Sequence, residues 1–201
     1  MRGWHPGNRL LTHPGSARAL VFIWSFAEAT VWPVMPDAAL VPLAAARSAA
    51  WWRLVLVATL GTLVGGLVSY LVGRVRPAEA LLARLPLVRP AMARQARAWL
   101  AAEGAAGLRH QPLSGLPYKV FAVQTGALGL PLGPFLGWTL LARGSRFLGV
   151  GATVAALGAR FRSPLRRYAG PLLLAWCVVF TLGLRQTVRA WERRGLEGLD
   201  T

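Results

Sequence analysis

The sequence has few acidic side chains and very little cysteine, lysine or histidine. Its 201 residues include seven Asp and Glu, three His and one Cys against 23 basic residues, of which Lys119 is the only lysine. The single cysteine, Cys177, excludes an intrachain disulfide. The histidines show no zinc-ligand spacing, and there is no phosphate-binding glycine loop, hydrolase elbow or metalloprotease motif. We therefore expect no metal, no cofactor and no enzymatic activity.

Long uncharged segments are abundant instead. The chain is 55% hydrophobic, with a mean hydropathy of +0.45. Residues 54–73 carry no charge, and a helix of that length spans roughly 30 Å of hydrocarbon. Residues 120–142 and 168–184 are further uncharged runs. This pattern predicts an all-α integral membrane protein.

The net charge of +16 comes mostly from arginines that lie between and beside the apolar runs. In these places they can contact anionic lipid headgroups and help to fix orientation. A soluble nucleic-acid-binding domain would not carry several segments of lipid-compatible length. We therefore expect membrane lipids, and not nucleic acid, as the partners of this chain.

The first half begins with a tail over residues 1–17 and an apolar segment over residues 19–46. Pro33 and Pro36 interrupt this segment, because each removes a backbone donor and disturbs the preceding turn. Its length favours a re-entrant hairpin that enters the membrane, breaks and returns. A span over residues 54–73 follows, with small residues recurring every four positions, which predicts close helix packing: Gly61, Gly65, Ser69 and Gly73.

A basic connector over residues 74–109 separates the two halves. Within it, residues 90–103 are predicted to form a short amphipathic helix at the membrane surface, with Pro90 near its start and Gly104 just past its end.

The arrangement of the first half then recurs. A broken apolar segment over residues 110–134 has predicted breaks at Pro117 and Gly126, and a span over residues 135–159 follows. Paired discontinuous segments in two halves indicate inverted repeats with a transporter-type site between them. A C-terminal transmembrane helix over residues 168–188 and a charged tail over residues 189–201 complete the predicted order.

Two carboxylates lie in the first broken segment, Glu28 and Asp37. A carboxylate in the centre of the hydrocarbon costs at least about 2.5–3.5 kcal/mol, so both need basic partners, water or a proton. The alternative is that both lie near the interface, where Asp37 after Pro36 would cap the next helix.

Three basic residues in the second half complement these acids. Arg143 and Arg146, three apart, share one helix face within the span, and Lys119 follows the break at Pro117. A guanidinium binds carboxylate and phosphate oxygens equally well. Alternatively, the helix ends near Arg143 and both arginines extend to the headgroup layer.

Three segments carry a family resemblance: SFAEATVWPVMPDAAL (25–40), ATLGTLVGGLVSYLVGR (58–74) and GLPYKVFAVQTGALGLPLGPFLGWTLLARGSRF (115–147). The first two resemble the DedA family of bacterial membrane proteins, also called the VTT or SNARE-associated family. The third is similar to its YqaA-like branch, through a Pro-Tyr-Lys-Val-Phe stretch followed by Arg-x-x-Arg-Phe. The resemblance covers roughly residues 20–160 and implies two inversely related re-entrant hairpins, each packed by a transmembrane helix, in the bacterial cytoplasmic membrane.

The same resemblance implies a flippase or scramblase for phospholipids or a polyprenyl-phosphate carrier, which in some members of the family depends on protons. By position, Glu28 and Asp37 match the acidic functional residues of the family, and Lys119, Arg143 and Arg146 match the basic ones. We expect these five residues to bind anionic headgroups and protons. A small-ion or solute transporter using the same site, or a membrane scaffold with internal ion pairs such as Glu28 with Arg146, are the alternatives.

Overall fold

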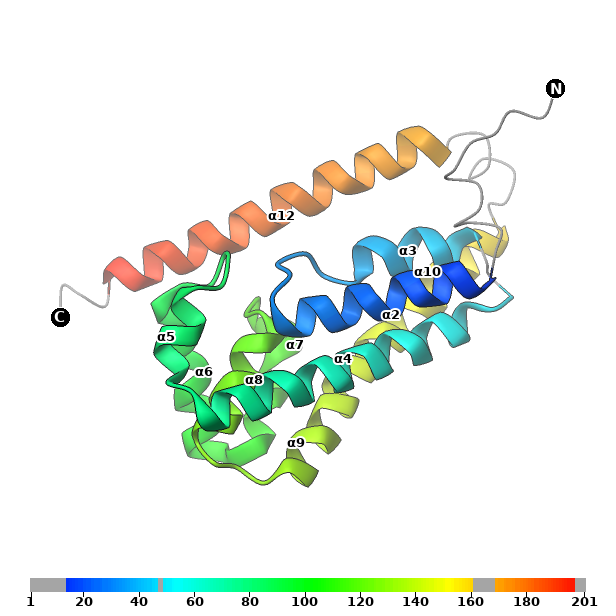
Figure 1. Ribbon diagram of the computed structural model, residues 1–201. Helices are drawn as coiled ribbons and strands as arrows, with labels where there is room; N and C mark the ends of the chain where they lie inside the picture. Colours follow the sequence, from blue (N-terminus) through cyan, green and yellow to red (C-terminus); the bar gives the residue numbers. More distant parts are fainter. Residues whose placement is uncertain (1–13, 47–48, 161–168, 198–201) are drawn as a thin grey trace.

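The computed structural model of the chain describes residues 14–46, 49–160 and 169–197. Within these residues every regular element is a helix, so the prediction of an all-helical protein is confirmed. Figure 1 shows the longer helices lying roughly along one direction, with the C-terminal helix running along one side.

The first broken segment forms two helices, α2 (Pro14–Thr30) and α3 (Asp37–Ala46). The chain turns back at residues 31–36, and α3 runs back alongside α2 (Figure 1). The break falls at the two prolines, as predicted, because Pro33 and Pro36 have no N–H to continue a helix. Since α2 already begins at Pro14, the predicted tail over residues 1–17 is too long; residues 1–13 lie outside the described part.

The helix that follows, α4 (Trp51–Val75), packs between α2 and α8 (Tyr118–Ala127). A Cβ on Gly61 or Gly65 would lie 2.6 Å from a backbone oxygen of α2, and one on Gly73 would lie 2.2 Å from the Val123 oxygen of α8. Ser69 Oγ donates to the Ala29 oxygen at 2.7 Å. The prediction that small residues permit close approach is therefore confirmed.

The connector contains α5 (Ala78–Ala83), α6 (Pro90–Glu103) and a 3-10 turn, η1 (Gly104–His110). The predicted bounds of α6 are confirmed, with Pro90 in its first turn and Gly104 after its end at φ +61°. Its apolar face is buried against α8 and η1, with Met92, Ala96 and Leu100 inside. This apolar face therefore packs on protein, whereas a surface helix would have turned it towards lipid.

The second broken segment consists of α7 (Gln111–Ser114) and α8, separated by residues 115–117 with Gly115 at φ +70°. The predicted break at Pro117 is confirmed. The break predicted at Gly126 is wrong, because this glycine lies inside α8, where a Cβ would be 2.0 Å from the Tyr70 oxygen. Close contact with α4 therefore explains Gly126, and the chain turns three residues later, at Gly129, with φ +65°.

The predicted second span is one long helical stretch made of α9 (Leu132–Thr139), a π-helical turn η2 (Leu140–Gly144) and α10 (Ser145–Arg160). Two helices in the described part of the chain are long and apolar enough to cross a membrane. These are residues Trp51–Val75 and Leu132–Gly158, in which an 18-residue window reaches a mean hydropathy of 2.1 and 1.2, respectively.

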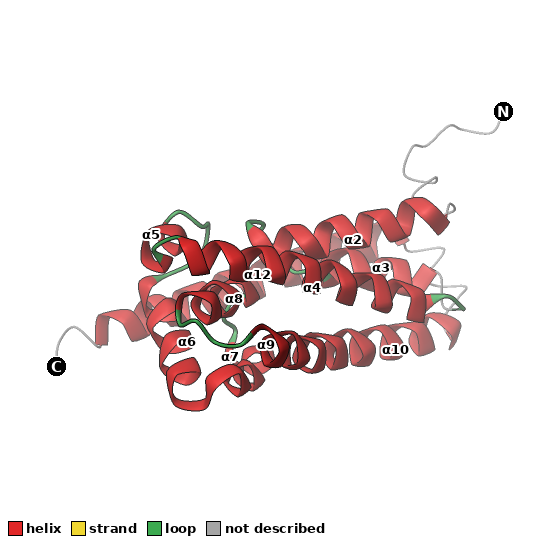
Figure 2. Cartoon of the chain, turned by 60° about the horizontal axis from the view of Figure 1, so that its bottom comes forward, coloured by secondary structure: helices red, strands yellow, loops and turns green. Residues whose placement is uncertain are grey.

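The C-terminal helix, α12 (Ala169–Glu197), covers the region predicted as a third span and continues through most of the predicted charged tail. Residue 168, residues 198–201 and the side chain of Cys177 lie outside the described part. Figure 2 shows α5 and α6 at the end of the bundle where α4 finishes, and α10 extending towards the opposite end.

Two buried apolar clusters hold these elements together. One joins α4, α6, α8 and α9 around Tyr70, Phe121 and Phe135, and the other joins α2, α3, α4 and α10 around Leu40 and Phe147. The charged residues predicted to form a site lie on the helices that contribute to these clusters.

Candidate functional site

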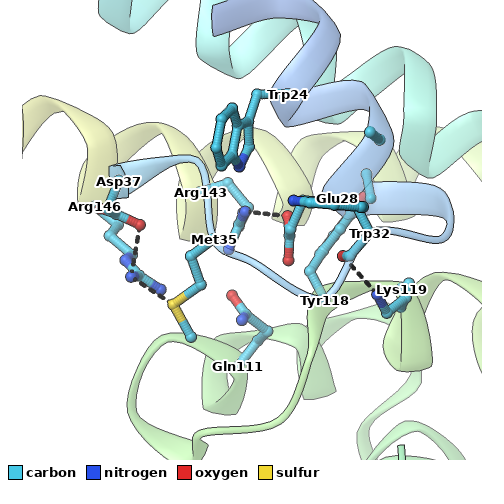
Figure 3. A network of polar contacts seen from close by, with 12 residues as sticks. Trp24, Glu28, Trp32, Met35, Asp37, Gln111, Tyr118, Lys119, Arg143 and Arg146 are labelled. Atoms are coloured by element: carbon cyan, nitrogen blue, oxygen red, sulfur yellow. Dashed lines mark hydrogen bonds and ion pairs between the residues drawn. The ribbon is translucent and has the colours of Figure 1, made fainter. Parts of the chain in front are cut away.

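The five charged residues predicted as a site gather around the loop between α2 and α3 (Figure 3). Glu28 lies near the end of α2 and Asp37 starts α3, whereas Lys119 comes from α8 and Arg143 and Arg146 come from η2 and α10. The cluster therefore joins the first broken segment to α8 and to the helical stretch that contains η2 and α10.

Glu28 and Arg143 form the most deeply buried ion pair in the described part of the chain. Arg143 Nη2 lies 2.6 Å from Glu28 Oε2, and their side chains are 1% and 4% exposed. In an apolar interior such a pair is retained only when each charge compensates the other, because either one alone would carry an uncompensated desolvation cost. The pair fixes α2 to the π-helical turn η2.

Arg143 is enclosed by aromatic rings. Its guanidinium carbon lies 5.3 Å from the centroid of Tyr118 and 5.0 Å from that of Phe147, within the range of cation–π attraction. The Tyr118 hydroxyl in turn lies 3.0 Å from Thr139 Oγ1. Arg143 Nε is buried without a hydrogen-bond partner in the structure, so the guanidinium keeps one unused donor.

Asp37 and Arg146 form a second, more accessible pair. Arg146 Nη2 donates to Asp37 Oδ2 at 2.9 Å and also contacts Met35 Sδ at 3.2 Å. The side chain of Arg146 is 23% exposed, whereas that of Asp37 is 7% exposed. This pair holds the start of α3 against α10.

Lys119 binds the loop backbone. Its Nζ donates to the Trp32 carbonyl oxygen at 2.7 Å, and the residue is 1% exposed. On the other side of the loop, Trp24 Nε1 donates to the Val34 oxygen at 3.0 Å. The turn between α2 and α3 is therefore held by one donor from its own hairpin and one from the second half.

The structure resolves the alternatives about these residues. Glu28 pairs with Arg143, so the pairing with Arg146 considered from sequence is wrong. Arg143 is buried, which excludes its extension to a headgroup layer. Asp37 does not cap α3: the Pro36 oxygen accepts the first helical bonds, and the Asp37 carboxylate faces Arg146.

Sequence reasoning missed the groups that complete the cluster: Tyr118, Phe147, Met35 and the Trp32 carbonyl. Tyr118 and Phe147 each neighbour a predicted basic residue, so an aromatic next to an intramembrane cation was an available signal. A backbone carbonyl as the partner of Lys119 has no signal in sequence.

The cluster holds three basic and two acidic side chains, which gives a formal charge of 3 − 2 = +1. Its surplus positive charge and the unused Arg143 donor suit an anion. A phosphate competes for a guanidinium with the same bidentate geometry as a carboxylate. No group of three or more potential metal ligands occurs among the described residues.

Comparisons with known proteins do not assign the chain to a family. No protein-family model matches the chain, and no solved structure matches it. A protein of Haemophilus influenzae (strain ATCC 51907 / DSM 11121 / KW20 / Rd), described as an uncharacterized protein, is 26% identical over 157 residues, which cover 77% of this chain and 80% of that protein.

Proposed function

We propose that the chain is an integral membrane protein of the DedA/VTT type that moves anionic lipid headgroups between leaflets. The observation that carries this proposal is the buried cluster of opposite charges. This cluster joins the turn of the α2–α3 hairpin to the start of α8 and to the π-helical turn η2. Charges held inside apolar helices are costly and generally mark the path of a substrate or proton.

The outer surface of the bundle supports membrane embedding. Large apolar side chains of α4 point outwards along its whole length, with exposures from 37% to 75%. They are Trp52, Leu56, Leu60, Val64, Val68, Leu71, Val72 and Val75. An apolar strip of this length is unfavourable in water and suits lipid chains.

The proposed architecture is a pair of inverted repeats, each a re-entrant hairpin followed by a span. The first hairpin is α2–α3 and its span is α4; the second hairpin is α7–α8 and its span is the stretch from α9 to α10. The contact between Lys119 and the Trp32 carbonyl supports this arrangement, because it joins the breaks of the two hairpins.

In this proposal the paired cluster is the empty state of the site. An arriving headgroup phosphate replaces the carboxylates on Arg143 and Arg146, and Glu28 takes up a proton from water when Arg143 turns to the phosphate. Asp37 and Arg146 form the entry, since this pair is the more exposed of the two. Lys119 adds a third positive charge behind the loop.

The pairing of both carboxylates with arginines favours a second candidate, a non-transporting membrane scaffold. In that case the ion pairs only hold the hairpins in place. Replacement of a buried ion pair by uncharged side chains of similar volume often preserves or raises stability. A variant of this pair can therefore test transport while the protein remains folded.

The test is headgroup movement in reconstituted vesicles containing fluorescent phospholipids. The double variant Glu28→Gln/Arg143→Met removes both charges and should fold, yet transport should fall at least tenfold. Arg53→Gln, which removes an exposed arginine, is the control and should transport at the wild-type rate. Movement at the wild-type rate in the folded double variant would overturn the assignment of the site to this pair. Movement by wild type no faster than in protein-free vesicles would overturn the lipid-transport proposal and leave the scaffold.

A further inference from the structure

A cavity of about 370 Å³ lies in the connector, away from the charged cluster described above. Its walls come from α5, the first turns of α6 and one side chain of α8. These elements lie at the end of the bundle where α4 finishes (Figures 1 and 2). If α4 crosses a bilayer, the cavity is at the level of the lipid headgroups on that side.

Three arginines line the cavity and only one carboxylate does, that of Glu79. Arg89 is engaged by Glu192 of α12. In the described part of the chain, no carboxylate pairs with Arg94 or Arg97. These two residues are three positions apart on α6, so they present their guanidinium groups on one face. Two unpaired guanidinium groups at the wall of a concave site bind phosphate or carboxylate oxygens.

Gln124 supplies an independent sign of a ligand. It is 2% exposed and lines the cavity from α8. Its Nε2 makes one long contact with the Ala93 oxygen, at 3.5 Å, and its Oε1 is buried with no partner in the structure. Buried acceptors are nearly always satisfied, so the orphan amide oxygen of a residue that lines the cavity indicates a missing donor, which a ligand can supply once the side chain turns towards it.

We propose that this cavity binds a phosphate group that also carries a hydroxyl, as in a glycerol-phosphate headgroup. Arg94 and Arg97 hold the phosphate at the mouth, and the Gln124 oxygen accepts a hydrogen bond from the hydroxyl inside. This choice of ligand follows from the groups without partners in the described part of the chain: the guanidinium groups of Arg94 and Arg97 as donors and the Gln124 oxygen as acceptor. This site is separate from the proposed transport site and does not depend on transport.

The test uses the full chain in uncharged detergent micelles, with bound lipid counted by native mass spectrometry. Phosphatidylglycerol and phosphatidylmethanol carry the same charge and differ in the headgroup hydroxyls, so their comparison isolates the Gln124 contact. Wild type should bind phosphatidylglycerol about two- to tenfold more tightly, the range expected of one net hydrogen bond. Gln124→Met should abolish this preference while keeping the thermal unfolding temperature near wild type.

The arginines are tested with a matched pair of double variants. Arg94→Gln/Arg97→Gln should weaken phosphatidylglycerol binding at least tenfold. Arg76→Gln/Arg84→Gln removes the same charge from exposed positions of the connector that do not line the cavity, and should change binding less than about threefold. Equal losses in both variants, or equal binding of the two lipids by wild type, would overturn the proposal.

Soluble glycerol 3-phosphate distinguishes the source of the ligand. Displacement of phosphatidylglycerol by this compound would assign the cavity to a free phosphate ester, whereas failure to displace it would assign the cavity to a lipid. The variant Glu28→Gln/Arg143→Met separates the two proposals, because it should lose transport and retain binding in the connector.

Discussion

Lys119 donates from Nζ to the backbone oxygen of Trp32, 87 positions earlier in the chain, at 2.7 Å. The one lysine of the sequence therefore holds the turn of the α2–α3 hairpin from the second half of the protein. Because Lys119 is 1% exposed, the contact is a local determinant of how the two halves fit together.

Replacing Lys119 should destabilise this junction. Lys119→Met leaves the Trp32 carbonyl without its donor, and the expected loss in the free energy of unfolding is about 1–3 kcal/mol. Thermal unfolding in detergent measures it. Lys119→Arg keeps the charge but brings a larger, planar group to a site that is 1% exposed, so transport should also fall. Transport at the wild-type rate in Lys119→Arg would show that positive charge alone is needed there.

The Glu28–Arg143 pair should show strong coupling in a double-mutant cycle. Glu28→Gln leaves Arg143 buried without its counter-charge, and Arg143→Met leaves Glu28 in the same position, so each single change should cost about 3–5 kcal/mol. The double variant should lose much less than the sum of the two single changes, because it leaves no unpaired charge buried. Additive losses in the cycle would mean that the two side chains do not compensate each other.

Glycine at position 126 should not tolerate a methyl group. Gly126→Ala places a Cβ 2.0 Å from the Tyr70 oxygen, and the resulting shift of α8 against α4 should cost about 1–3 kcal/mol. Gly149→Ala in α10 is the control, because no atom lies within 4 Å of the added carbon and alanine favours a helix. This control should be neutral or slightly stabilising in the same unfolding experiment.

The connector should contribute a pH-dependent term to stability through Glu103. His110 Nε2 lies 2.9 Å from Glu103 Oε1 and Arg109 Nε lies 3.2 Å from Oε2. The hydrogen bond with His110, together with the charge of Arg109, outweighs desolvation and lowers the pKa of Glu103 below its ordinary value of 4.5.

A carboxyl whose pKa is lower in the folded state stabilises the fold above its unfolded pKa. This stabilisation is lost as the pH falls through the lowered folded pKa. Unfolding curves of wild type and Glu103→Gln should therefore differ most above about pH 5 and converge in stronger acid. A difference that is constant over this range would exclude the ionised Glu103 contact as its source.

Much of the fold could be predicted from sequence because its causes are local. The uncharged run over residues 54–73 gave the first candidate span, paired prolines gave the break at residues 31–36, and Pro90 with Gly104 gave the bounds of α6. Gly126 was misassigned to a break because a glycine has the same sequence signature at a turn and at a close helix contact. The two situations differ only in whether another helix lies against the glycine.

Sequence by itself also determined that Glu28, Asp37, Arg143 and Arg146 needed partners, since an isolated charge in an apolar segment is too costly to retain. Which partner each received was decided by tertiary structure alone. The π-helical turn and the packing of α3 against α10 place Arg143 on Glu28 and Arg146 on Asp37, across more than a hundred residues of chain. Lys119 received a carbonyl oxygen, because the folded hairpin brings that atom, and not a carboxylate, within its hydrogen-bonding reach.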